Sequence, residues 1–167
     1  EMPGGQFTNL KAQARSLGLE EKWADVARTY ADVNQMFGDI VKVTPSSKVV
    51  GDMALAMVSA GLTRADIEDP DKPFSFPDSV VSFFHGDLGQ PPNGFPSALQ
   101  KKVLGETKPL TERPGASVPP ADFGALRKEA EAAAEREITD EEFQSYLMYP
   151  KVFTDFAKFQ ADFGPVD

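Results

Sequence analysis

Residues 23–37, WADVARTYADVNQMF, carry the strongest structural signal in the chain. Their apolar side chains recur with a period of 3.6 residues, which is typical of a helix with one face in a protein core. These side chains are Trp23, Val26, Ala27, Tyr30, Val33, Met36 and Phe37. The charged residues Asp25, Arg28 and Asp32 fall on the opposite face. The stretch therefore predicts an amphipathic helix, which Gly38 is placed to end.

The same periodicity predicts helices on both sides of this stretch. We expect them over residues 7–17, 46–60, 77–84, 96–104, 122–137, 139–147 and 150–163, with one further short turn opened by a capping box at Thr63 and Asp66. A second capping box, Thr139 with Glu142, opens one of the last helices. Residues 40–43 are a candidate short strand. The fold class is therefore predicted to be all-α, with eight or nine helices.

Proline divides the chain into three regions, residues 1–63, 64–120 and 121–167. Ten of the fourteen prolines lie between Pro70 and Pro120, and proline ends helices because it lacks a backbone N–H. The middle region still carries many large apolar side chains, more than a disordered linker contains. They are Phe74, Phe76, Val80, Val81, Phe83, Phe84, Phe95 and Leu99. We expect this region to be an ordered wrap over a helical core.

Composition limits the classes of site and partner. The length of 167 residues suits one domain or a piece of a larger one, and Glu1 in place of methionine predicts a fragment or a processed product. The chain has no cysteine and one histidine, which excludes a disulfide scaffold and a Cys/His zinc site. The net charge of −9 argues against nucleic acid and anionic membranes as partners. No apolar run approaches the roughly 20 residues of a membrane span.

Common catalytic motifs are missing from the sequence. There is no Gly-rich dinucleotide fingerprint and no P-loop. His85 lies at a predicted helix end, where a histidine interacts favourably with the helix dipole, so a capping or surface role is expected for it. The carboxylates of residues 129–142 belong to helices and are expected to be solvated rather than to bind a metal.

The segment 42–52, KVTPSSKVVGD, is the most informative for chemistry. Pro45 disfavours the α conformation at Thr44, so Thr44 is expected in extended chain before a helix that Ser46 or Ser47 caps. Free backbone N–H groups would gather at that helix start. Lys48 in the first turn opposes the helix dipole. Two interpretations stay open: Lys48 pairs with Asp52 four residues on, or it joins an oxyanion or carbonyl-oxygen site.

Six segments in order resemble the pyruvate carboxylases. They are residues 1–10 (EMPGGQFTNL), 43–52 (VTPSSKVVGD), 76–81 (FPDSVV), 89–95 (GQPPNGF), 113–115 (RPG) and 148–153 (MYPKVF). The resemblance runs over the whole chain. It implies the C-terminal helical part of the carboxyltransferase domain, a funnel-like or layered arrangement that packs on a (β/α)8 barrel lying upstream and absent from this chain.

The resemblance also implies a function. Pyruvate carboxylases carboxylate pyruvate to oxaloacetate with ATP, bicarbonate and biotin, and residues 1–63 would form part of the carboxybiotin pocket. Thr44 resembles the threonine that relays a proton between pyruvate and the biotin ring nitrogen. Ser47 and Lys48 resemble the residues that face the ureido oxygen of biotin. The divalent metal of the family, zinc or manganese, would be held by the barrel and by no residue here, so the chain alone is expected to be inactive.

The implied partners are the biotin carrier domain and the barrel, within a homotetramer in the bacterial cytoplasm or the mitochondrial matrix. Three alternatives remain: the α subunit of oxaloacetate decarboxylase, the carboxyl-transferring subunit of transcarboxylase, and a non-catalytic helical interaction module. The first two share the barrel-plus-helices design and a similar Val-Thr-Pro segment. The continued match through Met148–Phe153 favours pyruvate carboxylase.

Overall fold

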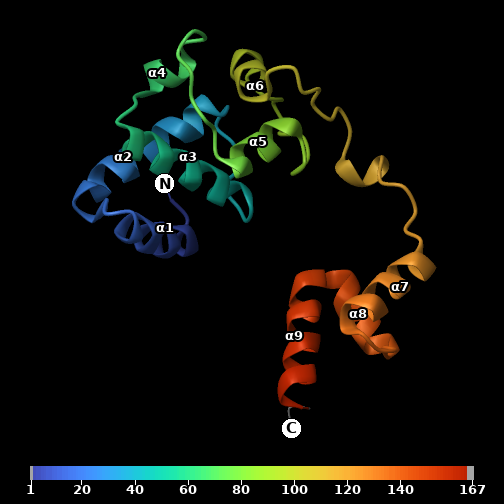
Figure 1. Cartoon of the computed structure of the whole chain (residues 1–167). Helices are drawn as coiled ribbons and strands as arrows, with labels where there is room; N and C mark the ends of the chain where they lie inside the picture. Colours follow the sequence, from blue (N-terminus) through green and yellow to red (C-terminus); the bar gives the residue numbers. More distant parts are fainter. Residues whose placement is uncertain (1, 165–167) are drawn as a thin grey trace. The chain divides into compact units, whose positions relative to one another are not determined.

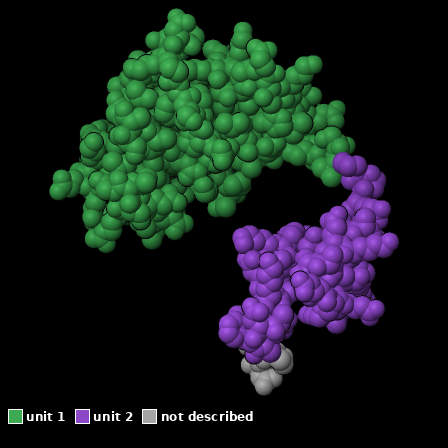
Figure 2. Space-filling model, viewed as in Figure 1, with its two compact units in different colours: residues 1–118 green, residues 119–167 purple. Residues whose placement is uncertain are grey.

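The computed structural model describes residues 2–164, which fall into two compact units, residues 1–118 and 119–167 (Figure 2). Nine α-helices and two short 3₁₀ helices make up the regular structure of the described residues, with no strand among them (Figure 1). The all-α prediction is therefore confirmed. Each unit has its own buried apolar cluster, so the two are described separately.

The first unit is built around two long helices that pack on each other. Its elements are α1 (Gly4–Ser16), η1 (Glu20–Lys22), α2 (Trp23–Met36), α3 (Ser46–Ala60), α4 (Arg64–Glu68), α5 (Asp78–His85), α6 (Ser97–Leu104) and η2 (Pro114–Ala116). The contact between α2 and α3 is the most extensive in the chain's described part. Helix α3 also packs on α1 and α5, which makes it the centre of the unit.

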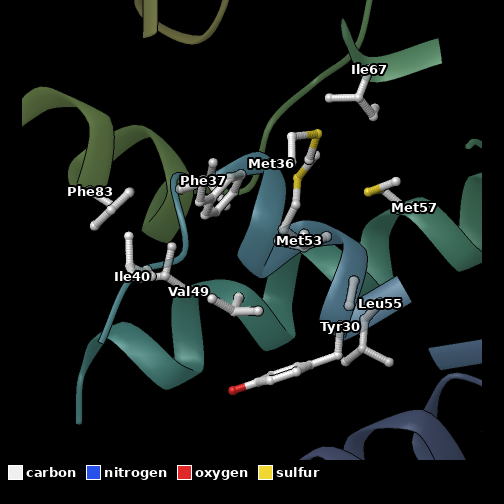
Figure 3. Close-up of a cluster of buried hydrophobic side chains, with 14 of the residues drawn as sticks. Tyr30, Met36, Phe37, Ile40, Val49, Met53, Leu55, Met57, Ile67 and Phe83 are labelled. Carbon is white, nitrogen blue, oxygen red and sulfur yellow. The ribbon is translucent and has the colours of Figure 1, made fainter. Parts of the chain in front are cut away.

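Apolar side chains from all six α-helices of the first unit, and from the chain that follows α2, form its core, part of which is drawn in Figure 3. Phe37 is completely buried, with its ring centroid 5.8 Å from that of Phe83 and 5.0 Å from that of Phe84. The stripe predicted on α2 is confirmed over most of its length. It is narrower than predicted, because Ala27 is exposed and Trp23 is only partly buried. Trp23 contacts Phe7 edge-on, at a centroid distance of 5.3 Å.

The proline-rich stretch packs on this core. Phe74, Phe76 and Phe95 are partly buried against the cluster, and the rings of Phe74 and Phe76 meet edge-on at 5.0 Å. Lys102 in α6 donates to the carbonyl oxygens of Ile67 and Asp69, at 2.7 and 2.6 Å. Through residue 118 the stretch belongs to the same compact unit as residues 1–63.

Some helix ends follow local sequence signals. Gly61 closes α3 in the left-handed conformation, with φ of 65°, where a glycine avoids the steric cost of a side chain. The capping box of Thr63 and Asp66 is present at α4. The candidate strand over residues 40–43 is wrong: Ile40 is buried, whereas Val41 and Val43 are exposed in irregular chain.

The second unit contains α7 (Phe123–Ala134), α8 (Asp140–Met148) and α9 (Pro150–Phe163). Its core is small and consists of Ala130, Ile138 and Phe153, with Ala134, Phe143 and Tyr146 packed around them. The predicted cap at Asp122 is confirmed, and so is the capping box of Thr139 and Glu142. Helix α7 ends three residues before the predicted Glu137, because Glu135 adopts the left-handed conformation with φ of 56°.

Candidate functional site

The candidate site lies where the irregular chain after α2 enters α3. Pro45 is the residue that precedes the helix, and no side chain caps it. The prediction that Ser46 or Ser47 caps α3 is therefore wrong. The Ser46 hydroxyl bonds backwards instead: its oxygen accepts from the Val43 N–H at 3.1 Å and lies 2.6 Å from the carbonyl oxygen of Val41. Ser46 thereby holds the loop of residues 41–45 against the start of α3.

Free backbone N–H groups were predicted to gather at this helix start. For Ser47 and Lys48 the prediction is wrong, because both N–H groups already have partners. The Ser47 N–H donates to the carbonyl oxygen of Val43 at 3.1 Å, and the Lys48 N–H donates to that of Pro45 at 3.0 Å. These bonds use the amides that an uncapped helix would offer to a ligand. Hydrogen-bond donors for an oxygen at this point must therefore come mainly from side chains.

The three residues predicted for the site lie within one turn of chain. Thr44 is exposed, in a turn with Pro45 to which it is joined by a cis peptide bond. The Lys48 side chain is 58% exposed. Ser47 is only 5% exposed, and its carbonyl oxygen accepts from the hydroxyl of Tyr30 at 3.4 Å. Thr44 and Lys48 are thus accessible to a ligand, whereas Ser47 joins the site to the core.

Lys48 is paired with Asp52 through its Nζ, as one of the two interpretations of the segment predicted. The Asp52 Oδ2 that faces this ammonium also accepts from the hydroxyl of Ser79 in α5, at 2.6 Å. The Asp52 side chain is 17% exposed. Sequence reasoning missed Ser79, because a residue 27 positions away in another helix leaves no local pattern.

A hydrogen bond between the side chains of Asn34 and Asp39 holds the start of the loop that leads from α2 to α3, and the sequence analysis did not predict it. The Asn34 Nδ2 donates to Asp39 Oδ1 at 2.7 Å, and Asp39 adopts a left-handed conformation with φ of 52°. The Asn34 Oδ1 is buried without a hydrogen-bond partner among the described residues. Burial raises the pKa of the neighbouring Tyr30 from 10 to about 12, so its phenol stays protonated well into the alkaline range.

Other chemical groups lie apart from this turn. No three His, Asp or Glu side chains of residues 2–164 come together as a set that could hold a metal ion. The Nδ1 of His85 lies 2.6 Å from Asp87 Oδ1 at the end of α5, in the surface position predicted for it. Among the described helices, none has the length and apolar character that crossing a membrane requires.

Comparison with known proteins decides the family. The model of a conserved carboxylase domain matches residues 1–167. Pyruvate carboxylase from Bacillus subtilis is 49% identical over 99% of this chain, and the human mitochondrial pyruvate carboxylase is 50% identical over all of it. The chain belongs to the pyruvate carboxylase family. It spans 14% of the length of either relative.

Solved pyruvate carboxylases have the same fold as this chain. The complete multifunctional enzyme from Rhizobium etli is 67% identical, with a TM-score of 0.92 over 99% of this chain and 16% of its own. The carboxyl transferase domain of the same enzyme, solved with pyruvate and biocytin, also has a TM-score of 0.92 and is 67% identical. The present chain covers 28% of that domain's chain. The prediction of a helical part of a pyruvate carboxylase's carboxyltransferase domain is therefore confirmed.

Proposed function

We propose that this chain forms part of the carboxybiotin pocket of an enzyme that carboxylates pyruvate to oxaloacetate with ATP, bicarbonate and biotin. One observation carries the proposal: the turn at Thr44 and the first residues of α3 present an exposed hydroxyl, that of Thr44, and an exposed ammonium group, that of Lys48. It does so in a chain that is 67% identical to a carboxyl transferase domain solved with pyruvate and biocytin. This donor set suits a ligand that offers carbonyl oxygen and ring nitrogen.

Thr44 is proposed to move the proton. When bound, carboxybiotin supplies the carboxyl group that pyruvate receives. The Thr44 hydroxyl is both donor and acceptor, so it can pass its own proton to the biotin ring nitrogen while it accepts one from the methyl group of pyruvate. The exposed position of Thr44 lets ligands approach the hydroxyl from solvent. Its neighbour Pro45 has no N–H that could replace the lost donor in a variant.

Ser47 and Lys48 are proposed to donate to the ureido oxygen of biotin. Negative charge on that oxygen increases as the carboxyl group leaves, and fixed donors stabilise such charge more strongly than water does. Because the Ser47 and Lys48 amides already bond to carbonyl oxygens, the side chains must supply these donors. The Lys48 side chain is 58% exposed, whereas Ser47 is only 5% exposed, so the proposed contact with biotin depends mainly on Lys48.

The divalent metal of the family does not fit residues 2–164, which hold no group of three suitable ligands. The expected ion is zinc or manganese. The residues that hold it are assigned to the upstream barrel. We therefore propose that the chain alone does not carboxylate pyruvate. It would act beside that barrel and the biotin carrier domain of a homotetramer, in the bacterial cytoplasm or, in a eukaryote, the mitochondrial matrix.

Thr44→Ala in the full-length enzyme tests the proposal. We expect carboxyl transfer to pyruvate to fall by about 10²- to 10⁴-fold, the usual contribution of a general acid–base group. Biotin carboxylation driven by ATP should be unchanged, and Thr44→Ser should keep part of the transfer activity because it retains a hydroxyl.

The two half-reactions are measured separately, with a melting curve beside them. Near-normal carboxyl transfer in Thr44→Ala would refute the proton relay. Joint loss of both half-reactions at a lower melting temperature would indicate a structural role. A full-length protein without ATP-dependent biotin carboxylation would instead favour an oxaloacetate decarboxylase or transcarboxylase subunit, and one without either half-reaction would favour an interaction module.

A further inference from the structure

Among the described residues, Asp52 is the group that joins Lys48 to another helix. It lies one turn after Lys48 on α3, so the two side chains share a face of that helix. Its Oδ2 faces the Lys48 ammonium and also accepts from the Ser79 hydroxyl of α5 at 2.6 Å. We propose that Asp52, held by Ser79, is a positioning residue that fixes the Lys48 ammonium for carboxyl transfer. This inference rests on the proposed role of Lys48.

The unequal exposure of the two side chains is what suits the pair to positioning. Asp52 is 17% exposed and therefore restricted by its surroundings, whereas Lys48 is 58% exposed and remains open to a ligand. An exposed lysine samples many rotamers, and each rotamer that turns the ammonium away weakens a donor aimed at one oxygen. A mostly buried carboxylate that is itself anchored removes most of those rotamers without covering the ammonium.

The second unit offers a matched pair without this arrangement. Lys151 and Asp155 have the same spacing of four residues in α9, with Nζ 2.7 Å from Oδ2. Their side chains are 85% and 60% exposed, so this Asp is far less confined than Asp52. Pairs of this exposed kind contribute little to stability. Asp155→Asn therefore removes a Lys–Asp pair of the same spacing where no positioning is proposed.

Two substitutions separate positioning from a merely structural link between α3 and α5. Asp52→Asn keeps an oxygen that can accept from Ser79 but removes the charge that attracts Lys48. Ser79→Ala removes the anchor of Asp52 and keeps its charge, and Ser79→Thr restores the hydroxyl. A positioning role predicts the larger effect for Asp52→Asn, a smaller one for Ser79→Ala and recovery in Ser79→Thr.

The experiment uses the full-length enzyme and two independent measurements. The first is the rate of reductive methylation of Lys48, followed by mass spectrometry with Lys101 as the reference amine. We expect Asp52→Asn to raise this rate roughly two- to fivefold, as expected for loss of one partly exposed ion pair. The second is carboxyl transfer, which should fall about 10- to 100-fold in kcat, as a displaced donor predicts. Biotin carboxylation and the melting temperature should be unchanged in Asp52→Asn. In the Asp155→Asn control, the Lys48 methylation rate and carboxyl transfer should also be unchanged.

Three results would overturn the inference. They are an unchanged methylation rate of Lys48 in Asp52→Asn, a raised rate with unchanged carboxyl transfer, and joint loss of both half-reactions with a lower melting temperature. Lys48→Met distinguishes this failure from failure of the proposed function. If Lys48→Met keeps carboxyl transfer, the proposed role of Lys48 is wrong. If it loses transfer while Asp52→Asn does not, only the positioning role of Asp52 is wrong.

Discussion

The ion pair between Arg136 and Glu142 makes the second unit sensitive to acid. The guanidinium contacts both carboxylate oxygens, at 3.0 and 2.5 Å, and the carboxylate also accepts from the Thr139 N–H at 2.9 Å. Hydrogen bonds from Arg136 and then from Thr139 lower the pKa of Glu142 from 4.5 to about 2. Glu142→Gln keeps an acceptor for the capping box and removes the charge.

The sign and size of the effect follow from linkage. Because the folded pKa lies below the unfolded one, the stabilisation is complete above about pH 4.5 and is lost as the pH falls to about 2. The full shift corresponds to about 3 kcal/mol, since one pKa unit is worth about 1.4 kcal/mol. Arg136 and Glu142 are 43% and 28% exposed, and solvent screening reduces this to about 1 kcal/mol.

Hydrogen exchange measured by mass spectrometry on peptides from residues 123–163 reports the opening free energy of this unit alone. The second unit must be measured separately because the first unit is also sensitive to acid: hydrogen bonds from Lys72 and Thr63 hold the pKa of Asp66 well below its usual range. We expect Glu142→Gln to lower the opening free energy by about 1 kcal/mol at pH 7 and by much less at pH 3. The control is Glu141→Gln, in the same first turn. An equal loss at both pH values, or an equal loss in the control, would refute the reasoning.

Two further substitutions test the packing and the backbone of the purified chain. Phe37→Ala should lower the free energy of unfolding by about 3–5 kcal/mol in urea denaturation, since the ring is fully buried. Leu17 is 57% exposed, so Leu17→Ala should lower it by less than about 1 kcal/mol. Similar losses in the two variants would contradict the described core. Glu135→Gly should stabilise the second unit by about 0.5–1 kcal/mol in the same exchange experiment, because Glu135 has a φ of 56°. Glu137→Gly is the comparison, and an equal destabilisation in both variants would show that the left-handed conformation carries no cost.

Local rules were enough to predict most of the helices. Both capping boxes form as predicted, and Gly61 ends α3, since each signal acts within one turn of chain. The failures lie where a local preference met a tertiary constraint. Ile40, Val41 and Val43 have apolar, β-branched side chains. The described chain offers no strand for them to pair with, and Ile40 is buried in the helical core instead.

The roles of the three candidate site residues came from family resemblance. Of their supports, the sequence predicted only the pairing of Lys48 with Asp52, four residues apart on one helix. Ser46 was expected to cap α3, but its hydroxyl bonds to Val41 and Val43, because those groups belong to irregular chain without a ladder partner. The Ser79 contact with Asp52 spans 27 residues. A pattern in sequence carries no record of such a contact, since it depends on how α5 packs against α3.

These supports restrain the irregular loop that carries the proposed site. A loop leaves backbone groups unpaired and gives catalytic side chains access to ligands, but it does not by itself hold them within the tolerance that proton transfer needs. Here Asn34 and Asp39 hold one end of the loop, and the Ser46 hydroxyl holds the other. Both supports are attached to α2 or α3, whose mutual contact is the most extensive in the described chain. Thr44 is therefore exposed and yet restrained by two rigid helices, the combination that the proposed proton relay requires.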